Sequence, residues 1–210
     1  MKTQFSLARS AGIIVGAAAL FSVSAAAATF EYDISVDTSS LIANPSAPFS
    51  LDFQLNDGDS TGNGNNTAIL SGFTFGGGSA SGGASVFGGA TGTLASQISI
   101  TDTAAFNELY EAFTAGSLLT FHLSVTHNAN SGETPDSFSF AVLDKDLANI
   151  PTTGLANTLV SIDLTPGTPT VLTGASGPVT VTVTPVPEPA DAAIVGTILA
   201  GLFACWRARK

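Results

Sequence analysis

The sequence predicts an all-β body: a two-sheet antiparallel β-sandwich of roughly nine strands with one short helix. An N-terminal signal peptide and a C-terminal transmembrane helix are expected to flank it. Three observations support this fold. Apolar and polar residues alternate in a series of short segments, as in strands that bury one face. Turn signals rich in Gly and Asn separate the segments, and the body holds a single basic residue, Lys145, where exposed helices would need several.

The alternating segments follow one another between residues 30 and 183. In the first, Phe30, Tyr32, Ile34 and Val36 face one way, and the polar residues between them face the other way. The segments are 30–36, 49–55, 69–75, 94–100, 119–125, 138–142, 160–164 and 179–183. Because each has one face to bury, we expect two antiparallel sheets packed against each other over residues 29–182.

One segment has the spacing of a helix instead. Its apolar residues are three and four positions apart, namely Phe106, Leu109, Tyr110 and Phe113. Asp102 or Thr103 could cap its N-terminus, and Gly116 could end it. We therefore expect a short helix or irregular plug over one end of the sandwich.

The charge of the body excludes one class of function. Between residues 29 and 187 there are fourteen Asp and Glu residues but only one base, Lys145. Such a surface repels nucleic acid and anionic membranes, so DNA and RNA are excluded as partners. The only cysteine, Cys205, lies outside this body, so disulfides cannot stabilise it and its stability depends on its hydrophobic core.

The first 28 residues have the layout of a secretory signal peptide. Lys2 and Arg9 form a basic start, residues 11–23 are apolar, and residues 24–28 are small enough to offer Ala-x-Ala cleavage sites. The alternative is an N-terminal membrane anchor, for which the apolar run is short. We expect export followed by removal of residues 1–28.

The C-terminus has three parts in a fixed order. The motif Val186-Pro187-Glu188-Pro189 ends a Pro-rich spacer over residues 183–189, an apolar run covers residues 192–206, and a basic membrane stop follows. The stop consists of Arg207, Arg209 and Lys210. We expect a transmembrane helix over residues 190–210. Its apolar run spans about 22 Å, short of a hydrocarbon core of about 30 Å, so a temporary anchor is favoured over an ordinary single-span anchor.

This tail resembles the PEP-CTERM sorting signal of Gram-negative bacteria over residues 186–210. The resemblance implies cleavage near Pro187-Glu188-Pro189 by an exosortase-type membrane transpeptidase. It further implies that an inner-membrane-anchored precursor is converted into a protein that is released or attached at the cell surface. Residues 53–58 and 73–78 are also similar to segments of PEP-CTERM proteins whose bodies are uncharacterised.

The best candidate for a binding site in the body is the polar loop over residues 57–66. Oxygen-bearing side chains stand at alternate positions, with Gly62 to turn the chain sharply, as at the start of a Ca²⁺ loop of the EF-hand type: Asp57, Asp59, Thr61, Asn63 and Asn65. Of these, Asp57, Asp59 and Asn63 are the candidate metal ligands. The acidic residue expected at position twelve is replaced by Ala68. The loop is therefore either a weak Ca²⁺ site, the one cofactor we consider, or a polar connection between two strands.

No pattern in the body indicates catalysis. His122 and His127 are five positions apart on one strand, so they face opposite ways, His122 outward, and neither has a ligand or catalytic partner nearby in the sequence. The carboxylate pairs Asp144/Asp146 and Glu108/Glu111 are interpreted as solvated surface charge. We therefore expect a protein that is not an enzyme.

Two functions remain. The first is an exported structural or adhesive protein of the cell surface or extracellular matrix, associated with exopolysaccharide, a partner implied by the sorting-signal resemblance alone. The second is a Ca²⁺-dependent carbohydrate-binding module built on residues 57–66. A secreted hydrolase is the third class, and no group of residues supports it.

Overall fold

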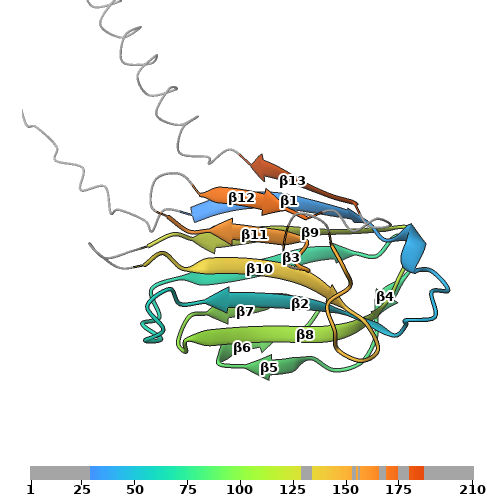
Figure 1. The fold of residues 1–210 in the computed structure, drawn as a ribbon, viewed down its shortest axis with the longest axis horizontal. Coiled ribbons are helices and arrows are strands. Elements are labelled where there is room, and N and C mark those ends of the chain that lie inside the picture. The colour runs from blue at the N-terminus through green and yellow to red at the C-terminus, as the bar shows by residue number, and fades with distance from the viewer. Residues whose placement is uncertain are drawn as a thin grey trace, which may run out of the picture.

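The computed structural model describes residues 29–128, 134–152, 155, 157–165, 169–174 and 180–186. In this part of the chain all regular structure is β, except for one 3₁₀ turn, η1 (Ser39–Leu41). Thirteen strands form two antiparallel sheets (Figure 1).

The six-stranded sheet has the order β13-β1-β9-β3-β7-β6. Its strands are β13 (Thr180–Val186), β1 (Thr29–Asp37), β9 (Leu118–Thr126), β3 (Thr67–Thr74), β7 (Ile98–Thr101) and β6 (Gly89–Gly92). The seven-stranded sheet has the order β12-β11-β10-β2-β8-β4, and β5 pairs with β8. Its strands are β12 (Thr170–Thr173), β11 (Val160–Asp163), β10 (Ser137–Leu143), β2 (Phe49–Asn56), β8 (Phe106–Thr114), β4 (Ser79–Ala80) and β5 (Ser85–Phe87).

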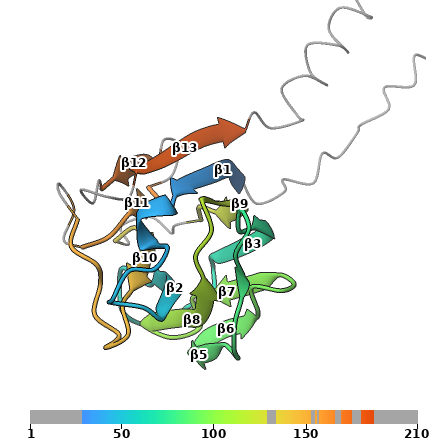
Figure 2. The ribbon, with the colours of Figure 1, turned by 90° about the vertical axis from the view of Figure 1, so that its right-hand side faces the viewer.

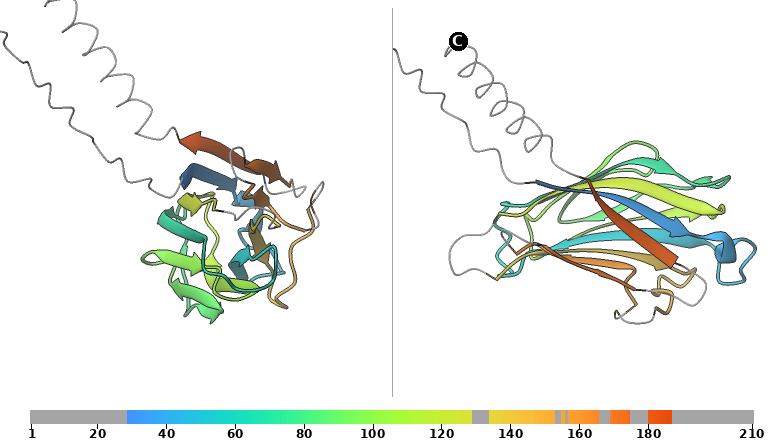
Figure 3. Two further views of the ribbon diagram at one scale, coloured as in Figure 1. Left: turned by 90° about the vertical axis from the view of Figure 1, so that its left-hand side faces the viewer. Right: turned by 90° about the horizontal axis from the view of Figure 1, so that it is seen from above.

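The two sheets pack face to face as the layers of a sandwich (Figures 2 and 3). Aromatic rings join the layers at the centre. Phe53 of β2 stacks on Phe140 of β10 at a centroid distance of 5.1 Å and meets Phe121 of β9, in the other sheet, edge-on at 5.5 Å. Alternate apolar residues of both sheets fill the rest of the core, as the period-two pattern predicts.

The predicted helix is wrong, because residues 106–114 form strand β8, which lies between β2 and the short strands β4 and β5. This strand pairs with β2 over eight register positions, from Phe49↔Phe113 to Asn56↔Phe106. Leu109 and Phe113 point into the core, whereas Phe106 and Tyr110 point outward. Inward-facing polar residues at the alternate positions Asn107 and Glu111 hide the period-two pattern.

The predicted number of strands is also too low. Apart from β8, the additional strands are β12 and three strands from the segment between residues 79 and 92, β4, β5 and β6. That segment consists mostly of small residues and shows no apolar alternation. At Gly78 an added Cβ would collide with the carbonyl oxygen of Thr114, so only glycine fits at the turn that leads into β4.

Both ends of the described body lie at the same end of the six-stranded sheet. β13 runs antiparallel to β1, with Val186 opposite Glu31 and Thr180 opposite Asp37. Residues 183–186, predicted as part of a spacer, therefore belong to an edge strand. Signal peptide 1–28, the motif residues Pro187, Glu188 and Pro189, and transmembrane segment 190–210 with its basic stop lie outside the described residues. Among the described residues, no helix has the length and hydropathy needed to cross a bilayer.

Candidate functional site

The loop that joins β2 to β3, residues 57–66, uses its predicted Ca²⁺ ligands to hold its own backbone. Asp57 Oδ1 accepts a hydrogen bond from Asp59 N at 2.8 Å, and Asp57 Oδ2 accepts bonds from Gly62 N at 2.8 Å and Asn63 N at 3.0 Å. Burial alone would raise the pKa of Asp57, but these backbone N–H groups outweigh it and lower the pKa. Asp57 thus stays ionised, and its carboxylate holds the backbone of the 57–66 loop in place.

The other two predicted ligands, Asp59 and Asn63, also accept hydrogen bonds from backbone N–H groups. Asp59 Oδ1 accepts a hydrogen bond from Thr134 N at 3.1 Å, and Asn63 Oδ1 accepts one from Asn65 N at 2.9 Å. In the described part of the chain, no three His, Cys, Asp or Glu side chains are grouped as metal ligands. In the described structure the three side chains thus accept hydrogen bonds from backbone N–H groups.

Directly behind this loop lies a buried polar group that we call the Asn66 cluster, formed by Asn66, Asp102 and Asp136. Asn66 precedes β3, Asp102 follows β7 and Asp136 precedes β10, so three strand ends meet here. Asn66 and Asp102 are 0% exposed and Asp136 is 5% exposed. Asn66 N donates to Asp102 Oδ1 at 3.0 Å, and Asn66 Nδ2 donates to Asp136 Oδ2 at 2.7 Å.

The 57–66 loop is hydrogen-bonded to the Asn66 cluster. Gly58 N donates to Asp136 Oδ1 at 2.9 Å, and Gly64 N donates to the Asp102 carbonyl oxygen at 3.2 Å. Burial, and then the neighbouring Asp136 carboxyl group, raise the pKa of Asp102 to about 7. The sequence shows Asp102 only as a residue near a turn, because the strand pairing that joins it to Asn66 and Asp136 is long-range.

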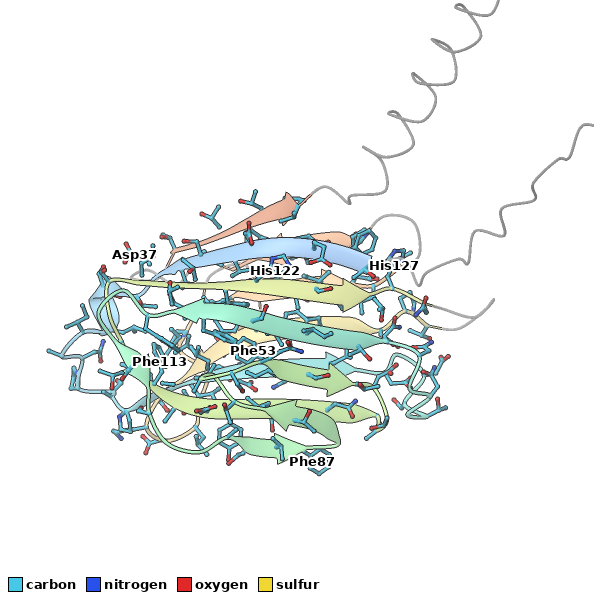
Figure 4. All side chains as sticks on the ribbon, turned by 180° about the vertical axis from the view of Figure 1, so that it is seen from behind. Asp37, Phe53, Phe87, Phe113, His122 and His127 are labelled. Atoms are coloured by element: carbon cyan, nitrogen blue, oxygen red, sulfur yellow. The ribbon has the colours of Figure 1, made fainter. Side chains whose placement is uncertain are left out.

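A second polar group lies on the outer face of the six-stranded sheet, around His122 (Figure 4). His122 Nε2 contacts Glu31, and His122 Nδ1 lies 3.0 Å from Asp33 Oδ1. The bond to Asp33, and then the contacts with Glu31, raise the pKa of His122 against the opposing effect of burial. The outward direction predicted for His122 is confirmed, but its carboxylate partners come from β1 and were not predicted.

A shallow cavity of about 250 Å³ opens beside His122. Its polar lining comes from three neighbouring strands, with Asp33 and Ser35 from β1, Thr120 and His122 from β9, and Thr184 from β13. A cavity of about 400 Å³ at the opposite end of the molecule from Thr29 is mostly apolar, with Leu41, Ile42, Phe49 and Phe113 in its lining. The lining of the smaller cavity thus combines hydroxyl groups with the His122 imidazole and the Asp33 carboxylate.

The carboxylate pairs differ from the prediction in one case. Glu108 and Glu111 lie on opposite faces of β8, and Glu111 is buried, where it accepts a hydrogen bond from Leu94 N at 2.7 Å. Asp146 is exposed, as predicted, and pairs with Lys145 at 2.6 Å, whereas Asp144 is partly buried and its Oδ1 accepts hydrogen bonds from Asp146 N and Ala148 N. On the outer face of the seven-stranded sheet, Gln54 Nε2 bridges Asp52 Oδ2 at 2.7 Å and Glu108 Oε1 at 3.2 Å.

Comparisons with known proteins give no further assignment, because no family model, curated protein or solved structure matches the chain.

Proposed function

We propose that this chain is an exported, non-enzymatic protein that is sorted through its C-terminus to the cell surface or extracellular matrix. One observation carries the proposal: the described strands all lie within the segment that processing would leave. β1 begins at Thr29, directly after predicted signal peptide 1–28, and β13 ends at Val186, directly before Pro187. Processing at these two places would therefore keep every described strand of both sheets in one chain.

The position of the two ends supports the same proposal. Because Glu31 lies opposite Val186 in the β1–β13 ladder, both flanking segments leave from one end of the sandwich. A precursor held at the membrane through its C-terminus would project the rest of the body outward. The partner in this step is an exosortase-type membrane transpeptidase, which acts near Pro187-Glu188-Pro189.

We further propose a structural or adhesive role with exopolysaccharide as the partner. The acidic body, with fourteen carboxylates and one lysine between residues 29 and 187, favours neutral polymers or polymers bridged through divalent cations. A Ca²⁺-dependent carbohydrate-binding module is the second candidate. The buried carboxylates behind the 57–66 loop favour it.

Replacement of the motif tests the sorting step. In the host bacterium, the variant with Pro187→Ala, Glu188→Ala and Pro189→Ala is expected to remain in the membrane fraction, whereas the wild type reaches the surface or the medium. The matched control changes Thr182→Ala and Thr184→Ala in β13, and its distribution is expected to follow the wild type. An identical distribution of wild type and motif variant would contradict the proposal.

A further inference from the structure

The Asn66 cluster holds two buried carboxyl groups in contact. Asp102 is 0% exposed and Asp136 is 5% exposed, and their side chains are hydrogen-bonded to each other. A bond between two carboxyl groups needs a proton on one of them, because a carboxylate oxygen can only accept. One of the two groups is therefore a neutral carboxylic acid in the folded protein.

The donors around the pair show which group holds the proton. Asp136 accepts an N–H bond on each oxygen, from Gly58 N to Oδ1 at 2.9 Å and from Asn66 Nδ2 to Oδ2 at 2.7 Å. Asp102 Oδ1 accepts one from Asn66 N at 3.0 Å, whereas its buried Oδ2 accepts no hydrogen bond from the described residues. The proton therefore belongs to Asp102 Oδ2, which donates it to the Asp136 carboxylate.

The surrounding elements supply no Lys or Arg side chain that would balance a second negative charge. The other titratable groups on these elements are Asp57 and Asp59 of the covering loop and His127 at the end of β9, whose ring stacks on Phe30 at 3.8 Å. Between residues 29 and 187 the only Lys or Arg is Lys145, in the exposed turn after β10. A second carboxylate at this buried place is costly, because it loses its hydration and gains no counter-charge.

We propose that Asp102 and Asp136 form a pH-sensitive switch that holds the 57–66 loop against the strand ends behind it. While the proton is in place, Gly58 is bonded to Asp136, and Asn66 is bonded to both carboxyl groups. Loss of the proton leaves two carboxylates that repel each other. Separation of Asp102 from Asp136 then breaks these bonds and releases the loop.

The direction of the switch follows from the pKa of Asp102. Burial, and then the neighbouring Asp136, raise this pKa to about 7 in the closed cluster, whereas a solvated aspartate in the open state has a pKa of about 4. The closed state thus holds an extra proton between about pH 4 and pH 7, and it loses stability relative to the open state as the pH rises through this range. The loop is held firmly in mildly acidic medium and is released at higher pH.

The switch lies at the end of the sandwich where β1 starts and β13 ends (Figure 1). Release of the loop frees the adjoining ends of β3, β7 and β10 at this end, from which both flanking segments leave the body. The switch does not depend on the proposed sorting, so failure of one proposal leaves the other standing.

Hydrogen exchange of the purified full chain in mild detergent tests the switch. Exchange is measured by mass spectrometry on peptides that cover residues 57–66 at pH 5, 6, 7 and 8, and each rate is divided by the rate of the unfolded peptide at the same pH. We expect protection of the wild-type loop to fall by up to about tenfold per pH unit between pH 5 and pH 7 and then to level off. Asp102→Asn should abolish this pH dependence, because its amide group donates to Asp136 at every pH.

Three control variants separate the switch from other titrations. Asp52→Asn removes another carboxyl group whose pKa is about 7, Asp146→Asn removes an exposed carboxylate, and His127→Gln removes the nearby imidazole. All three are expected to keep the pH dependence of the loop.

Asp136→Asn covers the case in which Asp102→Asn does not fold. Its amide group donates to the ionised Asp102, so its loop should also lose the pH dependence, with lower protection at every pH because one acceptor for Gly58 and Asn66 is lost. Wild-type protection that does not change between pH 5 and pH 8 would overturn the proposal. A pH dependence that persists in folded Asp102→Asn would overturn it too.

Discussion

Asp52 is an ionisable residue on the outer face of a sheet that is nevertheless only 2% exposed. Burial, followed by the negative charge of Glu108 on the neighbouring strand, raises its pKa to about 7. Gln54 Nε2 donates to both carboxylates but leaves Asp52 Oδ1 without a partner among the described residues. At neutral pH the buried Asp52 carboxyl group therefore lowers the stability of the fold.

The pH dependence of unfolding tests this assignment. The folded-state pKa of Asp52 lies above the unfolded-state value of about 4, so the folded protein holds an extra proton between about pH 4 and pH 7, and stability falls as the pH rises through that range. Asp52→Asn removes the penalty and is expected to raise the free energy of unfolding at pH 8 by on the order of 2 kcal/mol.

The matched control for Asp52→Asn is Asp146→Asn on the exposed surface, which should leave the pH dependence almost unchanged. Urea unfolding at pH 4, 6 and 8 measures both variants. If Asp52→Asn and wild type show parallel pH profiles, the raised pKa is assigned to the wrong residue.

At the scale of elements, β8 shows where pattern reasoning fails. The strands at 30–36, 49–55, 119–125 and 138–142 were predictable because their inward rows are wholly apolar. In β8, Asn107 and Glu111 occupy inward positions, and their hydrogen-bond partners Leu55 and Leu94 are distant in the sequence. Local spacing therefore favoured a helix, and long-range pairing with β2 decided the outcome.

The same limit applies to the candidate site. The polar 57–66 loop was recognisable from its composition, and it does connect two strands. The Asn66 cluster was not recognisable from the sequence, because Asp102 and Asp136 lie 36 and 70 positions after Asn66 along the chain. Only strand order and register bring them together, and neither is encoded in a local pattern.

Truncation of side chains along β8 separates the strand from the predicted helix. In the strand, Leu109 is fully buried and Phe106 is 37% exposed. Leu109→Ala is expected to cost about 2–5 kcal/mol of unfolding free energy, and Phe106→Ala no more than about 1 kcal/mol. Urea denaturation measures both. Equal losses would indicate that the two side chains share one buried face, as in the helix.

At the scale of the whole molecule, the two ends of the sandwich differ in the side chains they carry. The end that carries Thr29 and Val186 also carries the 57–66 loop and the Asn66 cluster. The opposite end carries η1 and the mostly apolar cavity around Leu41 and Ile42. A body sorted through its C-terminus would thus keep the Asn66 cluster near its attachment point and present the apolar end outward.

The most direct test of this account is the intact mass of the mature protein, isolated from the surface or medium of the host bacterium. We expect a chain that begins near Thr29 and ends near Pro187-Glu188-Pro189, free of the apolar run 192–206, with any attached group adding to the mass of that body. A protein that retains residues 192–210 at its final location would contradict the account.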